Sequence, residues 1–284
     1  MRGVRQTRSG ISVLGEQDLP AFEALTQRDP VVNVFAAHRA RTTRLEPRWL
    51  GGQVWGMFDS GELRSACHVG ANLVPVECSP EDARAFAGRA AGHGRTVATI
   101  VGPQDAVAPM WDVLQPAWGK AREIRWAQAH MALDGEPLVE PDPQVRVTPE
   151  DQLDVIYPAC VAMYREEVGT DPETGVPPGL YRTRVTQLVS RRWSFSRIED
   201  GRVLFKAEVA SASPYAAQVQ GVWVNPEHRG EGLSVGGMAA VAQIVRREIA
   251  PVCSLYVNHW NLPARRAYER VGFRRTATFA TVMF

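Results

Sequence analysis

Between a predicted strand and a predicted helix, the second half of the chain reads Asn225-Pro226-Glu227-His228-Arg229-Gly230-Glu231-Gly232-Leu233-Ser234. Gly230 and Gly232 let the backbone turn so that successive N–H groups point inward. The start of the following helix adds unbonded N–H groups and the positive end of its dipole. The stretch therefore predicts a loop that binds a pyrophosphate-like anion. The plainer alternative is a tight strand-to-helix turn with an ordinary N-cap.

The loop differs from two common nucleotide-binding loops. It has no Gly-Lys-[Ser/Thr] ending, which a Walker-type loop requires, and its glycines do not follow the G-x-G-x-x-G spacing. A Walker-type nucleotide site is therefore disfavoured, and the loop does not match the dinucleotide-binding fingerprint.

The segments around the loop predict a mixed α+β domain. Helices are expected over 152–167, 181–191, 235–249 and 262–271, and strands over 193–198, 203–210, 218–224, 254–257 and near 274–284. The first two strands are separated by Glu199-Asp200-Gly201, and Asp-Gly is a strong hairpin signal.

A linker divides the chain at 134–143, where three prolines and four acidic residues exclude a regular helix or central strand. We expect one domain over 1–137 and a second over 143–284. The first half predicts helices over 20–39, 80–91 and 105–114, and strands over 53–58, 63–69, 73–76, 96–101, 122–126 and 129–133. Its order of elements matches that of the second half, which favours a divergent internal duplication. The first copy lacks the glycine loop, because its third strand runs into Pro75–Pro80.

Composition limits the partners. The 284 residues carry a net charge of +1 and are 45% hydrophobic, as in an ordinary globular protein without a field for nucleic acid or anionic membranes. No apolar run resembles a signal peptide or a membrane span, so a cytoplasmic protein is expected. The four cysteines are too scattered for a disulfide framework or a zinc site, and His228 and His259 lack metal-ligand spacing. We expect no metal.

Two motifs together resemble the GNAT superfamily of N-acetyltransferases. The loop contains Arg229-x-x-Gly232-x-Ser234, with serine where the family has glycine or alanine. About 35 residues on comes Asn261-x-x-Ala264-x-x-x-Tyr268-x-x-x-Gly272-Phe273, without a gap. The resemblance covers residues 145–284 or so. The first half looks like a degenerate copy, so the whole chain resembles tandem GNAT proteins with an uncharacterised first domain. Residues 205–209 and 255–258 of this chain mark that second resemblance.

The resemblance implies a fold and a cofactor site. A mixed, mostly antiparallel sheet flanked by helices is expected in each of two tandem domains, and two parallel strands splay apart in the second. Acetyl-CoA would bind there as co-substrate, with its pantetheine arm paired to Val222, Trp223 and Val224. Its pyrophosphate would lie on the loop residues Arg229, Gly230, Glu231, Gly232, Leu233 and Ser234. Asn261 would contact the pantetheine or hold the splayed strands.

The same resemblance makes Tyr268 the general acid that protonates the departing thiolate, with a packing role in the core as the alternative. The base is left open. In ribosomal-protein-alanine acetyltransferases a glutamate lies five residues before the motif asparagine, but Tyr256 stands there in this chain. Glu208 is the candidate base, unless it is a surface charge paired with Lys206. Glu166 and Glu167 fall in the region that lines acceptor pockets, and a water chain is a further alternative.

These observations predict an N-acetyltransferase that moves an acetyl group from acetyl-CoA to a primary amine within a ternary complex. The alternative is a CoA-binding regulatory module without transferase activity. An aminoacyl-tRNA-dependent transferase is disfavoured, because it needs a basic RNA-binding face and no pyrophosphate loop. The acceptor is a small-molecule, peptide or protein amine. The first domain would shape the acceptor pocket or form the surface of a homodimer.

Overall fold

The computed structural model describes residues 8–174 and 177–284, which form two compact units. The first unit comprises the chain up to His130 together with Thr276–Phe284, and the second comprises Met131–Arg275. The final strand of the sequence therefore contributes most of its length to the first unit.

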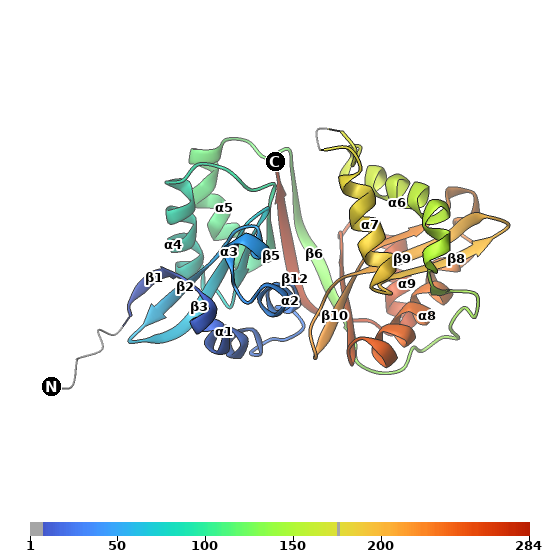
Figure 1. The fold of residues 1–284 in the computed structure, drawn as a ribbon, viewed down its shortest axis with the longest axis horizontal. Helices are drawn as coiled ribbons and strands as arrows, with labels where there is room; N and C mark the ends of the chain where they lie inside the picture. Colours follow the sequence, from blue (N-terminus) through green and yellow to red (C-terminus); the bar gives the residue numbers. More distant parts are fainter. Residues whose placement is uncertain (1–7, 175–176) are drawn as a thin grey trace. The chain divides into compact units, whose positions relative to one another are not determined.

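The first unit is a twisted sheet with helices on both faces (Figure 1). Its strands follow the order β1-β2-β3-β4-β5-β12-β6; β4 and β5 pair in parallel, whereas β1–β2, β2–β3, β3–β4 and β5–β12 are antiparallel. The elements are β1 (Gly10–Val13), α1 (Leu19–Thr26), α2 (Val34–Thr43), α3 (Pro47–Leu50), β2 (Gln53–Asp59), β3 (Glu62–Val69), β4 (Asn72–Val76), α4 (Pro80–Ala91), β5 (Thr99–Pro103), α5 (Gln104–Trp118), β6 (Glu123–Leu133) and β12 (Arg274–Met283).

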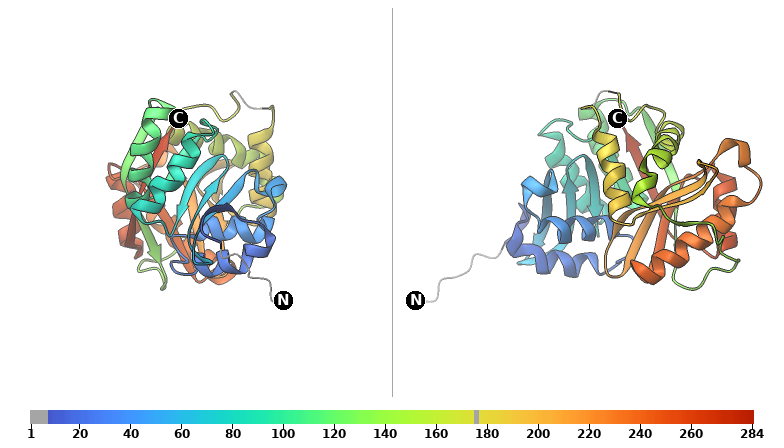
Figure 2. Two further views of the ribbon diagram at one scale, coloured as in Figure 1. Left: turned by 90° about the vertical axis from the view of Figure 1, so that its left-hand side faces the viewer. Right: turned by 45° about the vertical axis from the view of Figure 1, so that its right-hand side comes forward.

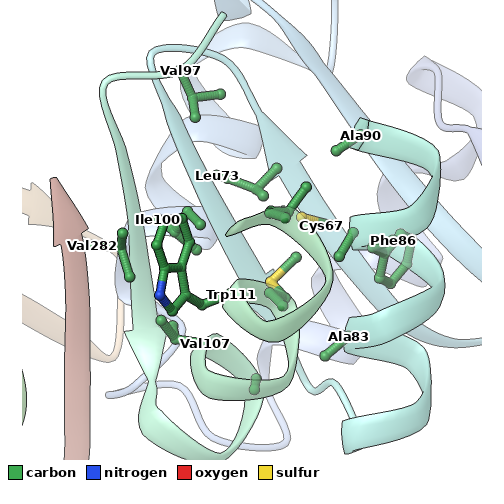
Figure 3. Close-up of a cluster of buried hydrophobic side chains, with 14 of the residues drawn as sticks. Cys67, Leu73, Ala83, Phe86, Ala90, Val97, Ile100, Val107, Trp111 and Val282 are labelled. Atoms are coloured by element: carbon green, nitrogen blue, oxygen red, sulfur yellow. The ribbon is translucent and has the colours of Figure 1, made fainter. Parts of the chain in front are cut away.

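Apolar side chains fill both faces of this sheet. On one face α4 and α5 bring Phe86 and Trp111 onto Ile100 of β5 and Val282 of β12 (Figure 3). On the other, Phe22 of α1 packs with Leu63 of β3. Because strand side chains alternate between faces, neighbouring residues of β3 serve both cores: Ala66 belongs to the α1 side and Cys67 to the α4 side.

The second unit repeats this layered architecture (Figure 1; further views in Figure 2). Within it the strand order is β11-β10-β9-β8-β7, and only β10 and β11 are parallel among the registered pairs. Its elements are β7 (Arg146–Val147), α6 (Leu153–Val168), α7 (Leu180–Ser190), β8 (Ser194–Glu199), β9 (Arg202–Ala212), β10 (Ala216–Val224), α8 (Leu233–Glu248), β11 (Val252–Val257) and α9 (Leu262–Val271). The expected α+β class and mostly antiparallel sheet flanked by helices are confirmed.

Two cores hold the second unit together. Ile156 and Met163 of α6, Val185 of α7 and Trp223 of β10 form one cluster. On the other face α8 approaches the sheet closely, because a Cβ at Gly237 would lie 2.8 Å from the ring of Phe205 on β9. A glycine at this position thus sets how near the helix carrying the glycine loop comes to the sheet.

Some elements differ from those predicted. The single helix expected over 20–39 is two helices, α1 and α2, with the turn 27–33 between them. The two strands expected over 122–126 and 129–133 are one strand, β6, in which Ala127 takes a positive φ of 57°. The short elements β1 and α3 were not predicted, since neither shows a usable periodicity.

The last strand also changes the division of the chain. The sequence boundary assigns all of 143–284 to the second domain, whereas β12 pairs with β5 from Phe279↔Pro103 to Met283↔Thr99. These pairs are formed by residues of the first unit, which includes Thr276–Phe284.

Candidate active site

The strands β10 and β11 separate after a short parallel ladder. They pair from Ala216↔Val252 to Gln218↔Ser254, and among the described residues β10 and β11 form no further pair beyond Gln218. On its other side β10 stays paired with β9, apart from a register shift between Gln220 and Trp223. The β11-facing edge of Val222–Val224 is therefore left without a strand partner among the described residues, and can receive an extended ligand.

Gly221 causes the irregularity in β10. Its φ is +59°, a conformation that strongly favours glycine, and the ladder to β9 resumes only at Trp223↔Lys206. A Cβ at this position would lie 2.9 Å from Met163 Cε and 3.2 Å from both Glu208 Cδ and Lys206 Nζ. The bulge thus brings the β10 backbone directly against a buried ion pair.

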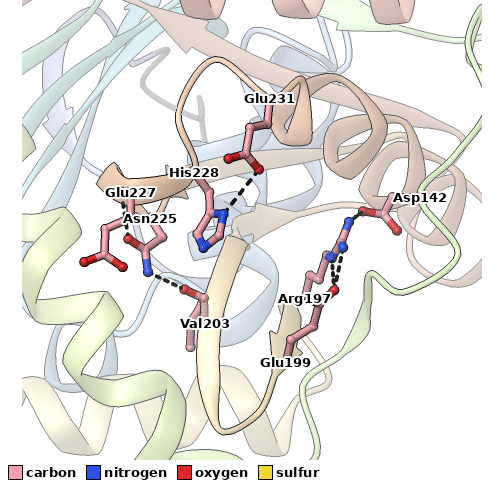
Figure 4. Close-up of polar contacts among 8 residues, drawn as sticks. All are labelled: Asp142, Arg197, Glu199, Val203, Asn225, Glu227, His228 and Glu231. Carbon is pink, nitrogen blue, oxygen red and sulfur yellow. Dashed lines mark hydrogen bonds and ion pairs between the residues drawn. The ribbon is translucent and has the colours of Figure 1, made fainter.

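The glycine loop joins β10 to α8 through a short 3₁₀ turn, Pro226–His228. Asn225 stabilises that turn, since its Oδ1 accepts a hydrogen bond from Glu227 N and its Nδ2 donates to Val203 O (Figure 4). Glu231 Oε2 lies 3.2 Å from His228 Nδ1, so this carboxylate is engaged within the loop. A second polar group in the same view, Arg197 with Asp142 and Glu199, ties β8 to the segment before β7.

The loop presents unbonded backbone donors at the start of α8. Gly230 and Gly232 have φ of +89° and +83°, and Gly232 is the N-cap without any side-chain cap. In the described part of the chain, the N–H groups of residues 230–234 have no hydrogen-bond acceptor. Five consecutive donors at the positive end of a 16-residue helix form a site for an anion.

Arg229 immediately precedes these N–H groups, but its guanidinium contacts α6 and the end of β10. Its Nη2 lies 2.6 Å from Glu166 Oε2 on α6, and its Nε donates to the Val224 carbonyl at 3.2 Å. Glu166 Oε1 accepts a further bond from Trp223 Nε1 at 3.0 Å. The last turn of α6, the end of β10 and the loop are thereby joined through one carboxylate.

The second motif forms α9. Asn261 is its N-cap, and its Oδ1 accepts a hydrogen bond from Ala264 N, which leaves the amide nitrogen of an exposed side chain for a ligand. Tyr268 lies on the inner face of the helix, only 7% exposed, and its ring packs near Phe273. Burial, together with the nearby Glu167 carboxylate, raises the pKa of the Tyr268 hydroxyl far above its ordinary value. The Tyr268 hydroxyl is therefore protonated and neutral at physiological pH.

Glu208 is buried rather than a surface charge. Its Oε2 accepts from Lys206 Nζ at 2.9 Å and its Oε1 accepts from Gln220 Nε2 at 2.8 Å. Burial by itself would raise the pKa of the Glu208 carboxyl, but the Lys206 ammonium and Gln220 outweigh it, so that pKa lies below its usual value. Glu208 is ionised at neutral pH.

The remaining neighbours of this pair come from the helices above it. Cys160 of α6 interacts with the Lys206 ammonium, and burial raises the pKa of its thiol. Tyr181 of α7 donates to the Cys160 carbonyl at 3.0 Å. Sequence reasoning did not select Gln220, Gly221 or Cys160; a glycine inside a strand was the one available signal, because it commonly marks a bulge or a close approach.

The first unit has the corresponding strands and helix without the anion site. The parallel pairing of β4 and β5 ends at Leu73↔Ile100, but beyond it a Cβ at Gly102 would lie 3.2 Å from the ring of Pro75. The start of α4 is capped by the Ser79 hydroxyl, which accepts from Asp82 N. Asp82 also places a carboxylate in the first turn. The start of α4 thus has a side-chain cap, whereas the N-cap of α8, Gly232, has none.

Comparison with known proteins agrees with this geometry. Residues 194–273 match the Acetyltransferase (GNAT) family, and residues 52–156 match a domain of unknown function, DUF4081. The search among curated proteins found no match.

Several solved structures share the fold. An acetyltransferase from the GNAT family of Colwellia psychrerythraea is 14% identical, with a TM-score of 0.54 over 96% of this chain and 99% of that one. A putative GNAT acetyltransferase from Novosphingobium aromaticivorans is 18% identical, with a TM-score of 0.54 over 88% and 94%. A tandem GNAT protein from the clavulanic acid biosynthesis pathway, solved without AcCoA, is 16% identical, with a TM-score of 0.52 over 96% and 98%.

The fold and the diverging strands define a GNAT-type architecture, and one similar structure is titled a tandem GNAT protein. The chain carries a domain of the GNAT acetyltransferase family at 194–273, preceded by the domain of unknown function, and is an acyltransferase. No helix of the described residues is long and apolar enough to cross a membrane. The same residues contain no cluster of three or more His, Cys, Asp or Glu side chains able to hold a metal ion.

Proposed function

We propose that the chain is an N-acetyltransferase that transfers an acetyl group from acetyl-CoA directly to a primary amine in a ternary complex. The observation that carries the proposal is the run of five unbonded N–H groups at residues 230–234, beside a strand edge that opens after Gln218. A diphosphate attached to an extended amide-containing arm fits these two features together, because one needs an anion and the other a strand-like partner.

In this proposal Val222, Trp223 and Val224 pair with the pantetheine amides, and the loop Arg229–Ser234 holds the diphosphate. Asn261 contributes its free amide group to the arm, since its oxygen already caps α9. Two further features support this placement: Gly221 interrupts β10 just before Val222, and the buried Tyr268 lies on α9, the helix that follows β11.

The chemistry divides between two groups. Amine attack on the thioester carbonyl forms the amide bond and expels the CoA thiolate, and Tyr268 donates its hydroxyl proton to that sulfur. The amine must also lose a proton, and Glu208 is the proposed base. Its ion pair with Lys206 keeps it ionised, and its place beneath the bulge puts it next to the β10 backbone. A backbone N–H of β10 near Val224 would stabilise the developing oxyanion.

Calorimetric titration of the purified chain with acetyl-CoA, run beside a free-thiol release assay over a panel of primary amines, tests the proposal. Binding together with amine-dependent thiol release is the expected result. Binding without release from any amine would favour a CoA-binding regulatory module. No binding of acetyl-CoA would overturn both.

A further inference from the structure

Glu166 holds Arg229 through a contact that is easily exchanged. The side chains of Arg229 and Glu166 are 50% and 45% exposed, and surface ion pairs contribute little stability. The bond from Trp223 Nε1 to the other carboxylate oxygen is better protected, since Trp223 belongs to the core beneath α6. Glu166 is therefore fixed on the indole, whereas Arg229 is free to change partner.

Both hydrogen bonds that Arg229 makes in this structure would have to break before its groups could take part in binding acetyl-CoA as proposed. Its Nη2 is paired with the Glu166 carboxylate, although Arg229 immediately precedes residues 230–234, whose N–H groups have no acceptor in the described part of the chain. Its Nε occupies the carbonyl of Val224, one of the backbone acceptors that a pantetheine amide would use. Within the loop itself, the Glu231 carboxylate contacts His228 and not Arg229 (Figure 4).

We propose that Glu166 acts as an internal competitor of the CoA diphosphate, holding Arg229 away until the cofactor displaces it. This inference rests on the proposed function. On binding, the guanidinium leaves Glu166 and the Val224 carbonyl and forms charge-assisted bonds to a phosphate oxygen. A diphosphate carries more charge than one carboxylate and matches the guanidinium fork, so the exchange is favourable. Glu166 is thus a positioning residue that acts through Arg229.

Glu166→Gln separates this role from a structural one. The amide keeps an oxygen to accept the Trp223 N–H but removes the charge that holds Arg229. We expect calorimetry with CoA to show affinity about three- to fivefold tighter than wild type, the scale of a surface ion pair. A merely structural residue would leave the affinity unchanged or weaken it.

Two further variants complete the test. Glu248→Gln is the matched control, because Glu248 also lies in the last turn of a helix and pairs with two arginines, Arg192 and Arg247. It should leave CoA affinity at the wild-type value. Arg229→Gln should weaken CoA binding. The double variant Arg229→Gln/Glu166→Gln should bind CoA no more tightly than Arg229→Gln alone.

The outcomes are distinct. If wild type binds CoA and Glu166→Gln is no tighter, the competitor role is overturned and the proposed function stands. If the gain persists in the Arg229→Gln background, it reflects general charge removal, which also overturns the role. If CoA binds to none of the variants nor to the wild type, the proposed function itself fails.

Discussion

Lys206 Nζ lies 2.9 Å from Glu208 Oε2, and the two side chains are 0% and 5% exposed. The pair sits beneath the β10 bulge, where a Cβ on Gly221 would touch both groups. A buried charge is tolerated only with its partner, so each residue depends on the other.

Replacing one member of this pair should destabilise the second unit strongly. We expect Lys206→Met or Glu208→Gln each to lower the free energy of unfolding by about 3–5 kcal/mol, because the remaining group is left buried without its partner. The double variant should lose much less than the sum. Urea denaturation of the four proteins checks this, and additive losses would show that the two charges do not depend on each other.

Tyr268→Phe should lower turnover by roughly a hundredfold, the lower end for a positioned acid, and leave acetyl-CoA affinity nearly unchanged. Burial raises the pKa of the hydroxyl, so the group stays protonated and its contribution should persist across neutral and moderately alkaline pH. Steady-state kinetics over pH, with calorimetry, measures both. Tyr215→Phe, at a 44% exposed tyrosine, is the control. Wild-type turnover of Tyr268→Phe at every pH would remove Tyr268 as the acid.

Gly232→Ala should weaken acetyl-CoA binding more than it weakens the fold. A Cβ there meets nothing within 4 Å in the protein, so added bulk enters the space of the proposed diphosphate. The positive φ costs about 1–2 kcal/mol in any case. Gly179→Ala controls for that cost, because Gly179 is the N-cap of α7 with φ 77° and ψ 2°, against 83° and 3° at Gly232. Equal binding by both variants would contradict the placement of the cofactor.

Two buried histidines should make the first unit acid-sensitive. Burial lowers the pKa of His68 and of His130 to about 4, from 6.5. Between about pH 6.5 and about pH 4 the unfolded chain therefore binds more protons than the native chain. The contribution of each histidine to the free energy of unfolding is complete above about pH 6.5 and decreases as the pH drops toward 4. The loss is at most about 3 kcal/mol per histidine, at about 1.4 kcal/mol per pKa unit.

Urea denaturation of wild type, His68→Gln and His130→Gln at pH 7 and near pH 4.5 measures this loss. Each variant should depend less on pH than the wild type does, while His93→Gln, at an exposed histidine, should follow the wild type. Equal pH dependence in all four proteins would show that the two imidazoles are not held neutral in the fold.

Local sequence signals determined much of the architecture. The predicted helices over 80–91 and 262–271 coincide with α4 and α9, because proline at the first turn and an apolar stripe specify such helices without distant partners. The glycine loop was recognisable for the same reason: backbone conformations open to few residues other than glycine leave a direct mark on the sequence.

The tertiary structure alone decided which distant groups meet. The residues of 274–283 do not predict that β12 pairs with β5, because the pattern of a strand specifies which face is buried and not which strand is its partner. The alternation along β9 placed Lys206 and Glu208 on one face, but their burial follows from α6 packing above them. The contact of Arg229 with Glu166 joins residues 63 apart in the chain, a separation that only the packing of α6 beside the end of β10 brings to 2.6 Å.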